Sequence, residues 1–511
     1  MAKTLTIDPM TRIEGHLKIK VEVDNSIVTK AYSAGEMFRG FEILLKNRSP
    51  LDAPMLTQRI CGVCPQAHGQ ASILALDEAF GVRPPSNGRL IRNLLLGANF
   101  LQSHILHFYH LTALDYVDIT AILKYEGHDP KLARIKNWVQ NDLDDGYAFA
   151  GAPFLPRYEG NYIEDTDLNI HAIASYVKAL EIRRKAHEML SIFGGKMPHC
   201  MTIFAGGVSQ KPTVDNIYAF KTRLNEITDF IDHYYIPDVL AIAKAYPDYF
   251  NIGKGVGNYL SYGGLYLNDE QTETLFTPGV YIDENPEVFN HAYITEHLSH
   301  SKYNDDGTGS SPPDGKTIPA PDKPKAYSFL KAPRYNDHVM ECGPLARTFI
   351  AYVKNSNQDV SALVNYTLNA LNITVEDLNS TMGRHAARAI EAKIVSKRMI
   401  DWLDELVPGK PIHTKFDIPD DASGKGLTAA PRGELGHWIK IKNKKIKNYQ
   451  AIVPTTWNGS PRDDNGNPGP FEQALIHTPV SDSDNPIEIG RVIRSFDPCL
   501  ACSIHVIKTN K

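Results

Sequence analysis

Two Cys-x-x-Cys pairs stand near opposite ends of this chain of 511 residues. The first pair is Cys61 and Cys64 and the second is Cys499 and Cys502, with 434 residues between Cys64 and Cys499. Four thiolates in two such pairs can bind a soft transition metal. A single site built from both pairs forms only when the two ends of the chain fold against each other, so this spacing constrains the whole fold.

The spacing also leaves other uses of the pairs open. A structural zinc site usually takes both pairs from one short module, commonly with about 12–20 residues between them, but a zinc site that joins the chain ends is an alternative. A redox-active pair is another, although neither pair lies in a thioredoxin-like βαβ pattern. The other two cysteines, Cys200 and Cys342, are expected to be buried small apolar side chains. Six cysteines in these positions do not suit a secreted disulfide framework.

Length and charge narrow the class of protein. The chain exceeds the usual size of one hydrophobic core, so one large elaborated unit or several packed subdomains are expected. A net charge of −5 without a long basic run argues against nucleic acid as the main partner. No apolar run approaches the roughly 18 residues of a membrane span. No signal-peptide core follows Met1, so we expect the chain to carry no export signal of its own.

Hydrophobic patterning predicts an α+β fold that is predominantly helical, with a bundle of long helices and peripheral β-hairpins. Alternating apolar residues around Asp24-Asn25-Ser26 predict a hairpin over residues 4–34. Helical periodicity covers roughly 65–127, 170–193, 213–245, 359–374 and 382–406. A β-like section is expected at 250–283, a loop at 301–325 and a hairpin at 433–453.

The residues that flank the cysteines carry a specific resemblance. The motifs, in chain order, are Arg12-Ile-Glu-Gly-His16, Phe38-Arg-Gly-Phe-Glu42, Arg59-Ile-Cys-Gly-Val-Cys-Pro with His68, His107-Phe-Tyr-His-Leu111, Gly194-Gly-Lys-Met-Pro-His199, Ala430-Pro-Arg-Gly-Glu434, Tyr449-Gln-Ala-Ile-Val-Pro-Thr-Thr-Trp457 and Asp497-Pro-Cys-Leu-Ala-Cys-Ser-Ile-His505. With these motifs the chain resembles the large, catalytic subunit of the nickel–iron hydrogenases, of the group 1 uptake type. The motifs span residues 5–505, effectively the whole chain.

The resemblance implies one catalytic unit over residues 1–511. Its parts are an N-terminal β-hairpin region at 1–60, a helical core at 61–250 and 355–410, a β and loop insertion at 251–354, and a C-terminal β region with the metal-binding end at 411–511. Cys61, Cys64, Cys499 and Cys502 would bind nickel, and Cys64 and Cys502 would also bind an iron that carries cyanide and carbon monoxide. Thiolates are soft donors that suit such metals.

The same resemblance assigns roles around the metals. Cys499 would act as the base that takes the proton from dihydrogen, and Glu14 would pass that proton on. Arg432, with Asp497 nearby, would place its guanidinium over the open metal position. His68 would hydrogen-bond to the bridging cysteine.

A second metal site is also implied. Glu42, the backbone carbonyl of Ala451 and His505 would bind magnesium or a similar divalent cation. The alternative for Glu42 is an ion pair with Lys46 one helical turn away.

Other positions receive weaker assignments. Many family members have an aspartate where this chain has Ser103, so part of the polar group over the metal differs here. For His104, His107 and His110, packing within a helix is at least as good an explanation as a direct role in the chemistry. His199 resembles the position that faces the partner's iron–sulfur cluster. Val63 and Leu111 align with residues that narrow the family's gas tunnel.

The implied function is reversible heterolytic cleavage of H2 into protons and electrons, running as uptake. Electrons need iron–sulfur clusters, and Cys200 and Cys342 cannot bind even one four-cysteine cluster. A small iron–sulfur subunit is therefore expected as an obligate partner, in a heterodimer or a dimer of heterodimers. The alternatives are an H2-sensing regulatory subunit and a zinc-stapled structural protein.

Further partners implied by the resemblance are a maturation chaperone, a C-terminal endopeptidase and a membrane cytochrome b. The expected location is the periplasm or the periplasmic face of the inner membrane, reached with the partner's export signal, with the cytoplasm as the alternative. Only Val506–Lys511 follows His505, and we expect cleavage there.

Overall fold

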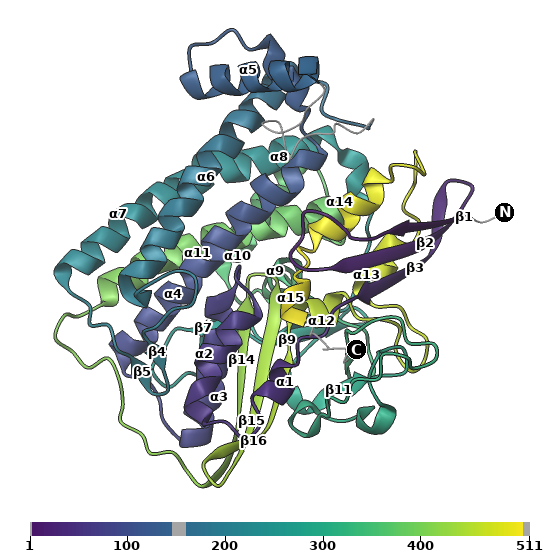
Figure 1. Ribbon diagram of the computed structural model, residues 1–511. Coiled ribbons are helices and arrows are strands. Elements are labelled where there is room, and N and C mark those ends of the chain that lie inside the picture. Colours follow the sequence, from purple (N-terminus) through teal and green to yellow (C-terminus); the bar gives the residue numbers. More distant parts are fainter. Residues whose placement is uncertain (1–2, 146–159, 504–511) are drawn as a thin grey trace.

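The computed structural model describes residues 3–145 and 160–503. Long helices lie side by side on one side of the molecule, and two three-stranded sheets lie on the other (Figure 1). The long helices are α4 (Ser86–Ile105), α6 (Thr166–Gly194), α7 (Val214–Phe230) and α11 (Thr381–Glu405). The fold class predicted from the sequence, α+β with a predominantly helical core, is confirmed.

Side-chain caps explain where three of these helices begin. The carboxylate of Asp165 accepts hydrogen bonds from the amides of Asp167 and Leu168 at the start of α6. Thr213 caps α7 in the same way, as the sequence predicts, and Ser380 caps α11. Each cap satisfies a backbone N–H that has no partner within the helix. Polar residues therefore set the helix starts, and burial of the apolar faces holds the helices together.

A second unit packs α3 (Pro65–Phe80) against an antiparallel sheet of β14 (Asp421–Ala430), β15 (Gly433–Lys442) and β16 (Lys445–Ile452). The predicted hairpin at 433–453 is confirmed as β15 and β16. Strand β14 joins it but has no clear strand pattern, because Gly424 and Gly426 interrupt it. A Cβ at Gly426 would lie 1.8 Å from the carbonyl oxygen of Ala71 on α3. These glycines therefore let the helix and the sheet approach closely.

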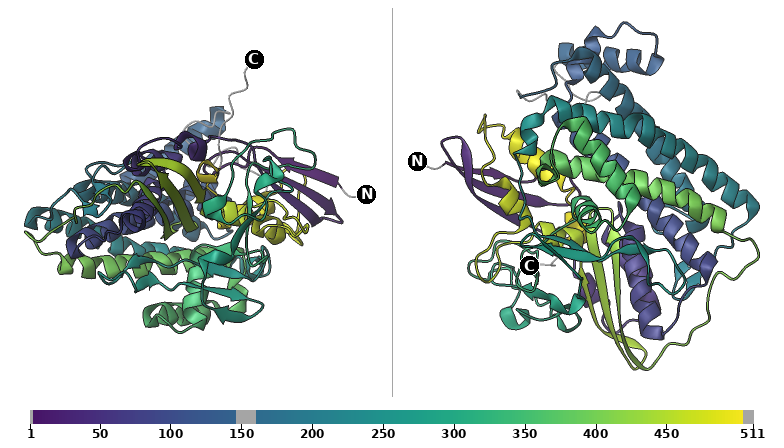
Figure 2. Two further views of the ribbon diagram at one scale, coloured as in Figure 1. Left: turned by 90° about the horizontal axis from the view of Figure 1, so that it is seen from below. Right: turned by 180° about the vertical axis from the view of Figure 1, so that it is seen from behind.

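The N-terminal sheet contains β1 (Lys3–Ile7), β2 (Leu17–Asp24) and β3 (Ile27–Gly35). The predicted hairpin is confirmed, with Asn25 and Ser26 both at positive φ in a two-residue turn whose twist matches that of the strands. The inner face of this sheet packs against α13 (Pro470–Leu475) and α14 (Ile487–Ser495) in one apolar cluster. Both views in Figure 2 show the N-terminal strands (purple) beside the helices α13 and α14 (yellow).

The remaining helices are α1 (Phe41–Leu44), α2 (Ala53–Thr57), α5 (Pro130–Asp145), α8 (Ile236–Ala245), α9 (Pro344–Val353), α10 (Gln358–Leu371), α12 (Pro454–Asn458) and α15 (Leu500–Ser503). The remaining strands are β4 (Ile203–Phe204), β5 (Gly207–Val208), β6 (Tyr259–Ser261), β7 (Gly264–Tyr266), β8 (Thr274–Phe276), β9 (Gly279–Ile282), β10 (Asn285–Glu287), β11 (Ile294–His297), β12 (Ala332–Tyr335) and β13 (Glu341–Cys342). The β-like section predicted at 250–283 is confirmed by β6 to β9. Residues 301–325 contain turns and two short 3-10 helices, as expected for a loop.

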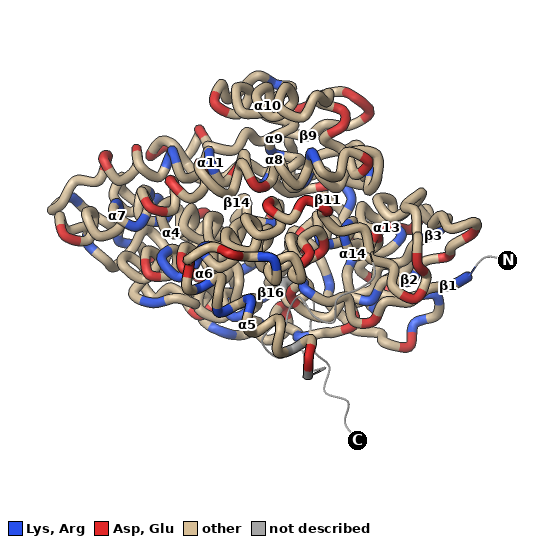
Figure 3. Tube along the Cα trace, turned by 90° about the horizontal axis from the view of Figure 1, so that it is seen from above, with Lys and Arg blue, Asp and Glu red and all other residues tan. Residues whose placement is uncertain are grey.

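Charged residues of both signs are interspersed over the face drawn in Figure 3. Within the described ranges, no helix combines the length and the apolar character needed to cross a membrane. Cys200 and Cys342 are 1% and 3% exposed, as predicted for small buried side chains.

A buried carboxylate links the two ends of the chain. Asp115 is fully buried and forms ion pairs with Arg12, from the N-terminal segment, and Arg494, from α14. Arg494 Nη1 lies 2.8 Å from Asp115 Oδ2. Burial alone would raise the pKa of Asp115, but the two guanidinium groups outweigh it and hold the pKa below its usual value. The two ends are thus joined by two arginines that pair with one carboxylate buried away from water.

Replacing Asp115 tests this link. Asp115→Asn leaves the buried Arg494 and the partly buried Arg12 without a compensating charge, so we expect the apparent free energy of unfolding to fall by about 3 kcal/mol. Urea unfolding followed by intrinsic fluorescence measures the change. The matched control is Asp229→Asn, which removes a carboxylate that is 64% exposed. Equal stability of the two variants would contradict the proposed role of Asp115.

Candidate metal centre

Sulfur atoms from both ends of the chain meet in the interior. The Sγ atoms of Cys61, Cys64 and Cys499 all lie within 4.8 Å of one another, and all three residues are buried. Cys61 Sγ and Cys499 Sγ are 3.3 Å apart. Cys502 lies in α15, three residues beyond Cys499, and its side chain is outside the described part of the structure. Converging thiolates are a donor set that fits a soft transition metal.

The first cysteine pair is held between a short 3-10 turn and a helix. Cys61 follows residues 58–60, and Cys64 is the residue immediately before α3, with Pro65 as the first residue of that helix. The amide of Val63 donates to Cys61 Sγ at 3.3 Å. The positive end of the α3 dipole stabilises negative charge at this point.

Arg39 fastens the loop of the first pair to the loop of the second. Its guanidinium donates to the carbonyl oxygen of Ile60 and, at 3.3 Å, to that of Ala501. Arg39 belongs to the Phe38-Arg-Gly-Phe-Glu42 motif, but sequence reasoning assigned it no role. Only its contact with both loops identifies it as a positioning residue.

The N-terminal segment runs alongside the second cysteine pair. Leu500 donates its amide hydrogen to the carbonyl oxygen of Glu14 at 2.6 Å, and Glu14 donates to the carbonyl oxygen of Pro498 at 3.3 Å. The side chain of Glu14 reaches the same place, because its Oε2 accepts from Cys499 Sγ at 3.2 Å and from the amide of Ala501 at 2.9 Å. Glu14 is therefore in contact with the terminal cysteine that the sequence analysis names as the base.

Burial raises the pKa of the Glu14 carboxyl above its usual value, and the charge of Cys61 adds to this effect. The hydrogen bonds from Cys499 and Ala501 act in the opposite direction but do not cancel it. A carboxyl group in this state exchanges protons more readily near neutral pH than an exposed glutamate does.

Arg432 occupies the two-residue turn between β14 and β15, and the turn directs it into the sulfur cavity. Its Nε lies 3.1 Å from Asp497 Oδ1, and both side chains are buried. Burial opposes the charge of Arg432, but Asp497 and the thiolates of the three cysteines keep its pKa well above the usual range. In the described structure its Nη1 has no hydrogen-bond partner. A fixed positive charge therefore faces the thiolates.

A small cavity separates these groups. Its lining contains Cys64, His68, Ala430, Arg432, Leu435, Pro454, Thr455 and Cys499. Thr455 accepts a hydrogen bond from the amide of Cys499 at 3.0 Å, a positioning role that the sequence did not reveal. The sequence did not point to Arg388 either. This residue is buried, and burial lowers the pKa of its guanidinium group, while the charge of Asp497 partly offsets that effect. Thr455 stands in the motif Tyr449–Trp457 but was assigned no role of its own, and Arg388 carries no signal in the sequence beyond its place in a helix.

Other predicted residues lie in the surrounding core. Ser103 is fully buried, and its hydroxyl has no partner among residues 3–145 and 160–503. His104 bonds to Glu391 at 2.9 Å and His107 to the carbonyl oxygen of Arg494 at 2.6 Å, which fits packed helix histidines. Burial lowers the pKa of His68 to about 4. Two residues assigned by resemblance to the partner interface and the gas path, His199 and Val63, are partly exposed.

A second polar cluster surrounds Glu42. Its Oε1 accepts from the amide of Ala451 at 2.9 Å, and its Oε2 accepts from the hydroxyl of Thr317. Lys331 lies 2.9 Å from Glu296 within the same buried cluster. Burial raises the pKa of Glu296, Lys331 lowers it, and the charge of Glu42 raises it further. Two carboxylates against one ammonium group fit a divalent cation.

Of the three predicted residues of this second site, Glu42 and Ala451 are adjacent, and His505 lies outside the described residues. Thr317 lies in the loop predicted at 301–325, and Glu296 and Lys331 lie outside that loop, within the predicted β and loop insertion at 251–354. No local motif pointed to them.

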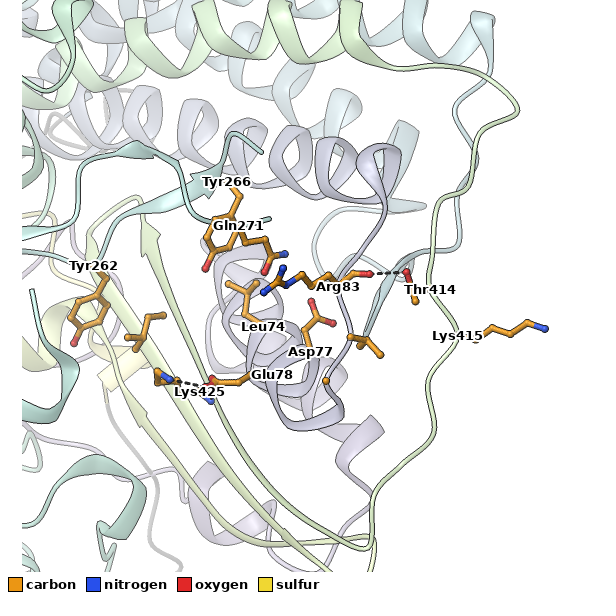
Figure 4. A pocket seen from close by; sticks show the side chains of 13 residues that line it. Leu74, Asp77, Glu78, Arg83, Tyr262, Tyr266, Gln271, Thr414, Lys415 and Lys425 are labelled. Atoms are coloured by element: carbon orange, nitrogen blue, oxygen red, sulfur yellow. Dashed lines mark hydrogen bonds and ion pairs between the residues drawn. The ribbon is translucent and has the colours of Figure 1, made fainter. Parts of the chain in front are cut away.

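A larger surface pocket of about 980 Å³ lies at the opposite end of α3 from Cys64 (Figure 4). Its polar residues include Asp77, Arg83 and Gln271. At about 1.5 Å per residue, the helix places this pocket roughly 20 Å from the thiolates. The buried chemistry is therefore separate from this wide opening.

Three buried cysteines, a carboxyl group and a guanidinium group form a candidate centre for a soft metal within a large, mainly helical fold. The family model for nickel-dependent hydrogenase matches residues 39–505, and a model described as HoxL-like matches residues 4–32. The large subunit of a periplasmic [NiFeSe] hydrogenase from Desulfomicrobium baculatum is 42% identical, over 98% of this chain and 95% of that protein. An uptake hydrogenase large subunit from Rhizobium leguminosarum bv. viciae is 40% identical, over 99% and 95%.

Solved structures agree with these relatives. The H2-activated [NiFeSe] hydrogenase of Dm. baculatum aligns with a TM-score of 0.87 at 41% identity, over 99% of this chain and 100% of that one. The reduced Ni-Fe-Se hydrogenase from D. vulgaris Hildenborough gives the same TM-score, identity and coverage. The chain belongs to the nickel-dependent hydrogenase family, as a catalytic large subunit. Hydrogenases are oxidoreductases that act on H2, and large subunits of the family carry the nickel–iron centre and pair with a small subunit.

Close approach at Gly15 offers a test of the geometry. Gly15 has φ +85°, and a Cβ there would lie 2.6 Å from the amide nitrogen of Ala501. We expect Gly15→Ala to push the N-terminal segment away from the cysteine pair, to lower stability by about 1–3 kcal/mol and to reduce nickel content. Thermal unfolding and elemental analysis measure both effects.

The matched control is Gly257→Ala, at φ +79° with open space around the added methyl group. It carries the backbone strain without the steric conflict, so its nickel content should stay at the wild-type level. Equal metal loss in both variants would contradict the argument from close approach.

Proposed function

We propose that Cys61, Cys64, Cys499 and Cys502 bind the nickel–iron centre, with Cys64 and Cys502 shared between nickel and iron. The observation that carries this proposal is the meeting of three sulfurs from opposite chain ends, within 4.8 Å of one another, with the sulfur of Cys499 in contact with Glu14. When bound, the centre would supply the Lewis-acid and redox chemistry that splits H2, and its iron would carry cyanide and carbon monoxide. The protein must then remove the proton and exclude water.

Cys499 and Glu14 would remove the proton. A terminal thiolate that takes a proton becomes a thiol, and the carboxylate of Glu14 lies 3.2 Å from that sulfur, within reach of direct transfer. The raised pKa of Glu14 brings it closer to that of a thiol, so the transfer is less uphill. For each H2 oxidised, two protons leave by such steps and two electrons pass to the partner subunit.

Arg432 would act on the substrate side of the cavity. Its side chain is 3% exposed, and Asp497 and the surrounding strands hold it in place. A fixed charge in a dry site polarises a small molecule without the cost of reorienting water. Asp497 would be a positioning residue for this guanidinium, and His68 would hydrogen-bond to the bridging sulfur.

Glu42, the carbonyl of Ala451 and His505 would bind magnesium. The buried excess of carboxylate in the cluster with Glu296 and Lys331 supports a cation here. Because His505 follows the second cysteine pair by three residues, a cation at this site would fix the C-terminal segment beside the catalytic centre.

We propose that a small subunit contains the iron–sulfur clusters, because this chain has six cysteines and four of them would belong to the nickel–iron centre. We further propose uptake activity, a heterodimer or a dimer of heterodimers, a periplasmic location through the partner's export signal, and an electron route through a membrane cytochrome b. We also propose two maturation partners, a chaperone and an endopeptidase that cuts after His505.

Metal and infrared analysis of the matured heterodimer tests the centre. We expect one nickel and one iron per large subunit and infrared bands in the region of metal-bound cyanide and carbon monoxide. Zinc in place of nickel, with no such bands, would support a zinc-stapled structural protein instead. Turnover separates the enzyme from a hydrogen sensor, since a sensor cleaves H2 slowly.

Removal of the Glu14 carboxyl tests the proton path. Glu14→Gln keeps the size of the side chain and its hydrogen bond from Ala501, but it cannot take up a proton. We expect nickel and iron content to remain, and isotope exchange between H2 and D2O to fall by at least about 100-fold. Mass spectrometry of the gas measures the exchange.

The control for this variant is Glu22→Gln, which removes a carboxylate on β2 that is paired with Lys30 on the protein surface. Its exchange rate should equal that of the wild type. If Glu14→Gln exchanges at the same rate as this control, Glu14 is not the relay.

A further inference from the structure

A chain of four buried polar side chains leads away from the sulfur cavity. His68 Nδ1 lies 3.3 Å from His437 Nε2, and His437 Nδ1 lies 2.8 Å from the hydroxyl of Tyr449. That hydroxyl lies 3.0 Å from Ser72 Oγ. All four residues are at most 1% exposed. The proposed function uses only His68, so the other three members have no role so far.

The fold itself assembles this chain. His68 and Ser72 are four residues apart on α3, so both face the same side of the helix. His437 comes from β15 and Tyr449 from β16, on the sheet that packs against α3. Four donors and acceptors from three elements therefore form a continuous connection that begins and ends on one helix.

Each link can carry only one hydrogen, so the links fix one another. Burial lowers the pKa of His437 well below its usual value, and so this imidazole is neutral with a single N–H. If Tyr449 donates to His437 Nδ1, the hydrogen of His437 must sit on Nε2. His437 then donates to Nδ1 of His68, and His68 must carry its own hydrogen on Nε2.

The reverse order has the opposite consequence. If His437 donated from Nδ1 to Tyr449, its Nε2 would accept from His68 Nδ1, and His68 Nε2 would be left with a lone pair. His68 lines the cavity beside Cys64. A lone pair directed at thiolates is repelled, whereas an N–H directed at them is attracted. Electrostatics in the cavity therefore favours the first order, in which the single hydrogen of Tyr449 goes to His437 Nδ1 at 2.8 Å and not to Ser72 Oγ at 3.0 Å.

We propose that Tyr449, acting through His437, holds His68 in the tautomer that carries its hydrogen on Nε2, toward the thiolates. Tyr449 and His437 are thus positioning residues that tune the electron density of the sulfur ligands. The inference rests on the proposed nickel–iron centre and on the role of His68 there. Residues that hydrogen-bond to the ligands of a metal, or to the neighbours of those ligands, fix the orientation of the ligands and change the redox potential of the metal.

The test is infrared spectroscopy of the matured heterodimer with Tyr449→Phe. We expect full nickel and iron content, because no sulfur is removed. Without the phenolic hydrogen, both histidines can change tautomer, and the hydrogen bond to sulfur weakens. The thiolate then donates more charge to iron, so the carbon monoxide band should move to lower frequency, and turnover should fall by roughly tenfold.

The control is Tyr109→Phe, which removes an equally buried hydroxyl whose partner is Asp238, away from the sulfur cavity. Its carbon monoxide band should stay at the wild-type frequency. An unchanged band in Tyr449→Phe, with normal bands in the wild type, would overturn the tautomer assignment. Absence of the bands in the wild type would instead overturn the nickel–iron centre, so the two failures are distinguishable.

A second variant separates tautomer control from packing. The double variant Tyr449→Phe with His437→Gln places an amide N–H where His437 Nε2 lies, and this donor does not depend on a phenol. We expect the carbon monoxide band to return toward the wild-type frequency. A band that stays where Tyr449→Phe puts it would show that lost packing, and not the hydrogen-bond order, causes the shift.

Discussion

The rest of the site depends on the backbone pairing between the N-terminal segment and the last described residues. The amide of Leu500 bonds to the carbonyl oxygen of Glu14, and this single short contact brings Glu14 and Cys499 together from positions 485 residues apart. Gly15 makes the approach possible, since any side chain there would meet the backbone of Ala501. Glu14 and Cys499 are thus placed by the main chain and not by flexible side chains, which gives a fixed geometry.

Paired charges around this contact are buried with it. Asp115 joins Arg12 to Arg494, and Asp497 holds Arg432. The half-buried Arg39 adds hydrogen bonds to backbone carbonyl oxygens of both cysteine loops. Buried ion pairs add little net stability, because desolvation offsets the attraction, but a missing partner is costly. Their effect here is to exclude alternative arrangements of the chain ends. A centre built from both ends requires that specificity, since apolar packing alone tolerates small shifts.

Patterns that act over a few residues could be read from the sequence. Asn25 and Ser26 form the expected hairpin turn, and Thr213 caps the expected helix, because turns and caps are local interactions. Strand β14 was harder to predict, because Gly424 and Gly426 weaken its strand pattern. The close approach of the α3 backbone explains these two glycines. The cluster of Thr317, Glu296 and Lys331 around Glu42 had no local signal, because its members lie in a segment of loops and short strands.

By itself the sequence determined the chemistry that is available: two pairs of soft sulfur ligands, a glutamate and an arginine within recognisable motifs, and too few other cysteines to carry electrons onward. Only the tertiary structure decided which atoms meet. It placed Glu14 3.2 Å from Cys499, turned Arg432 toward the thiolates, and linked His68 to Tyr449 through His437. The physical reason is that such contacts join residues hundreds of positions apart, so their distances follow from the packing of the whole chain and not from any local pattern.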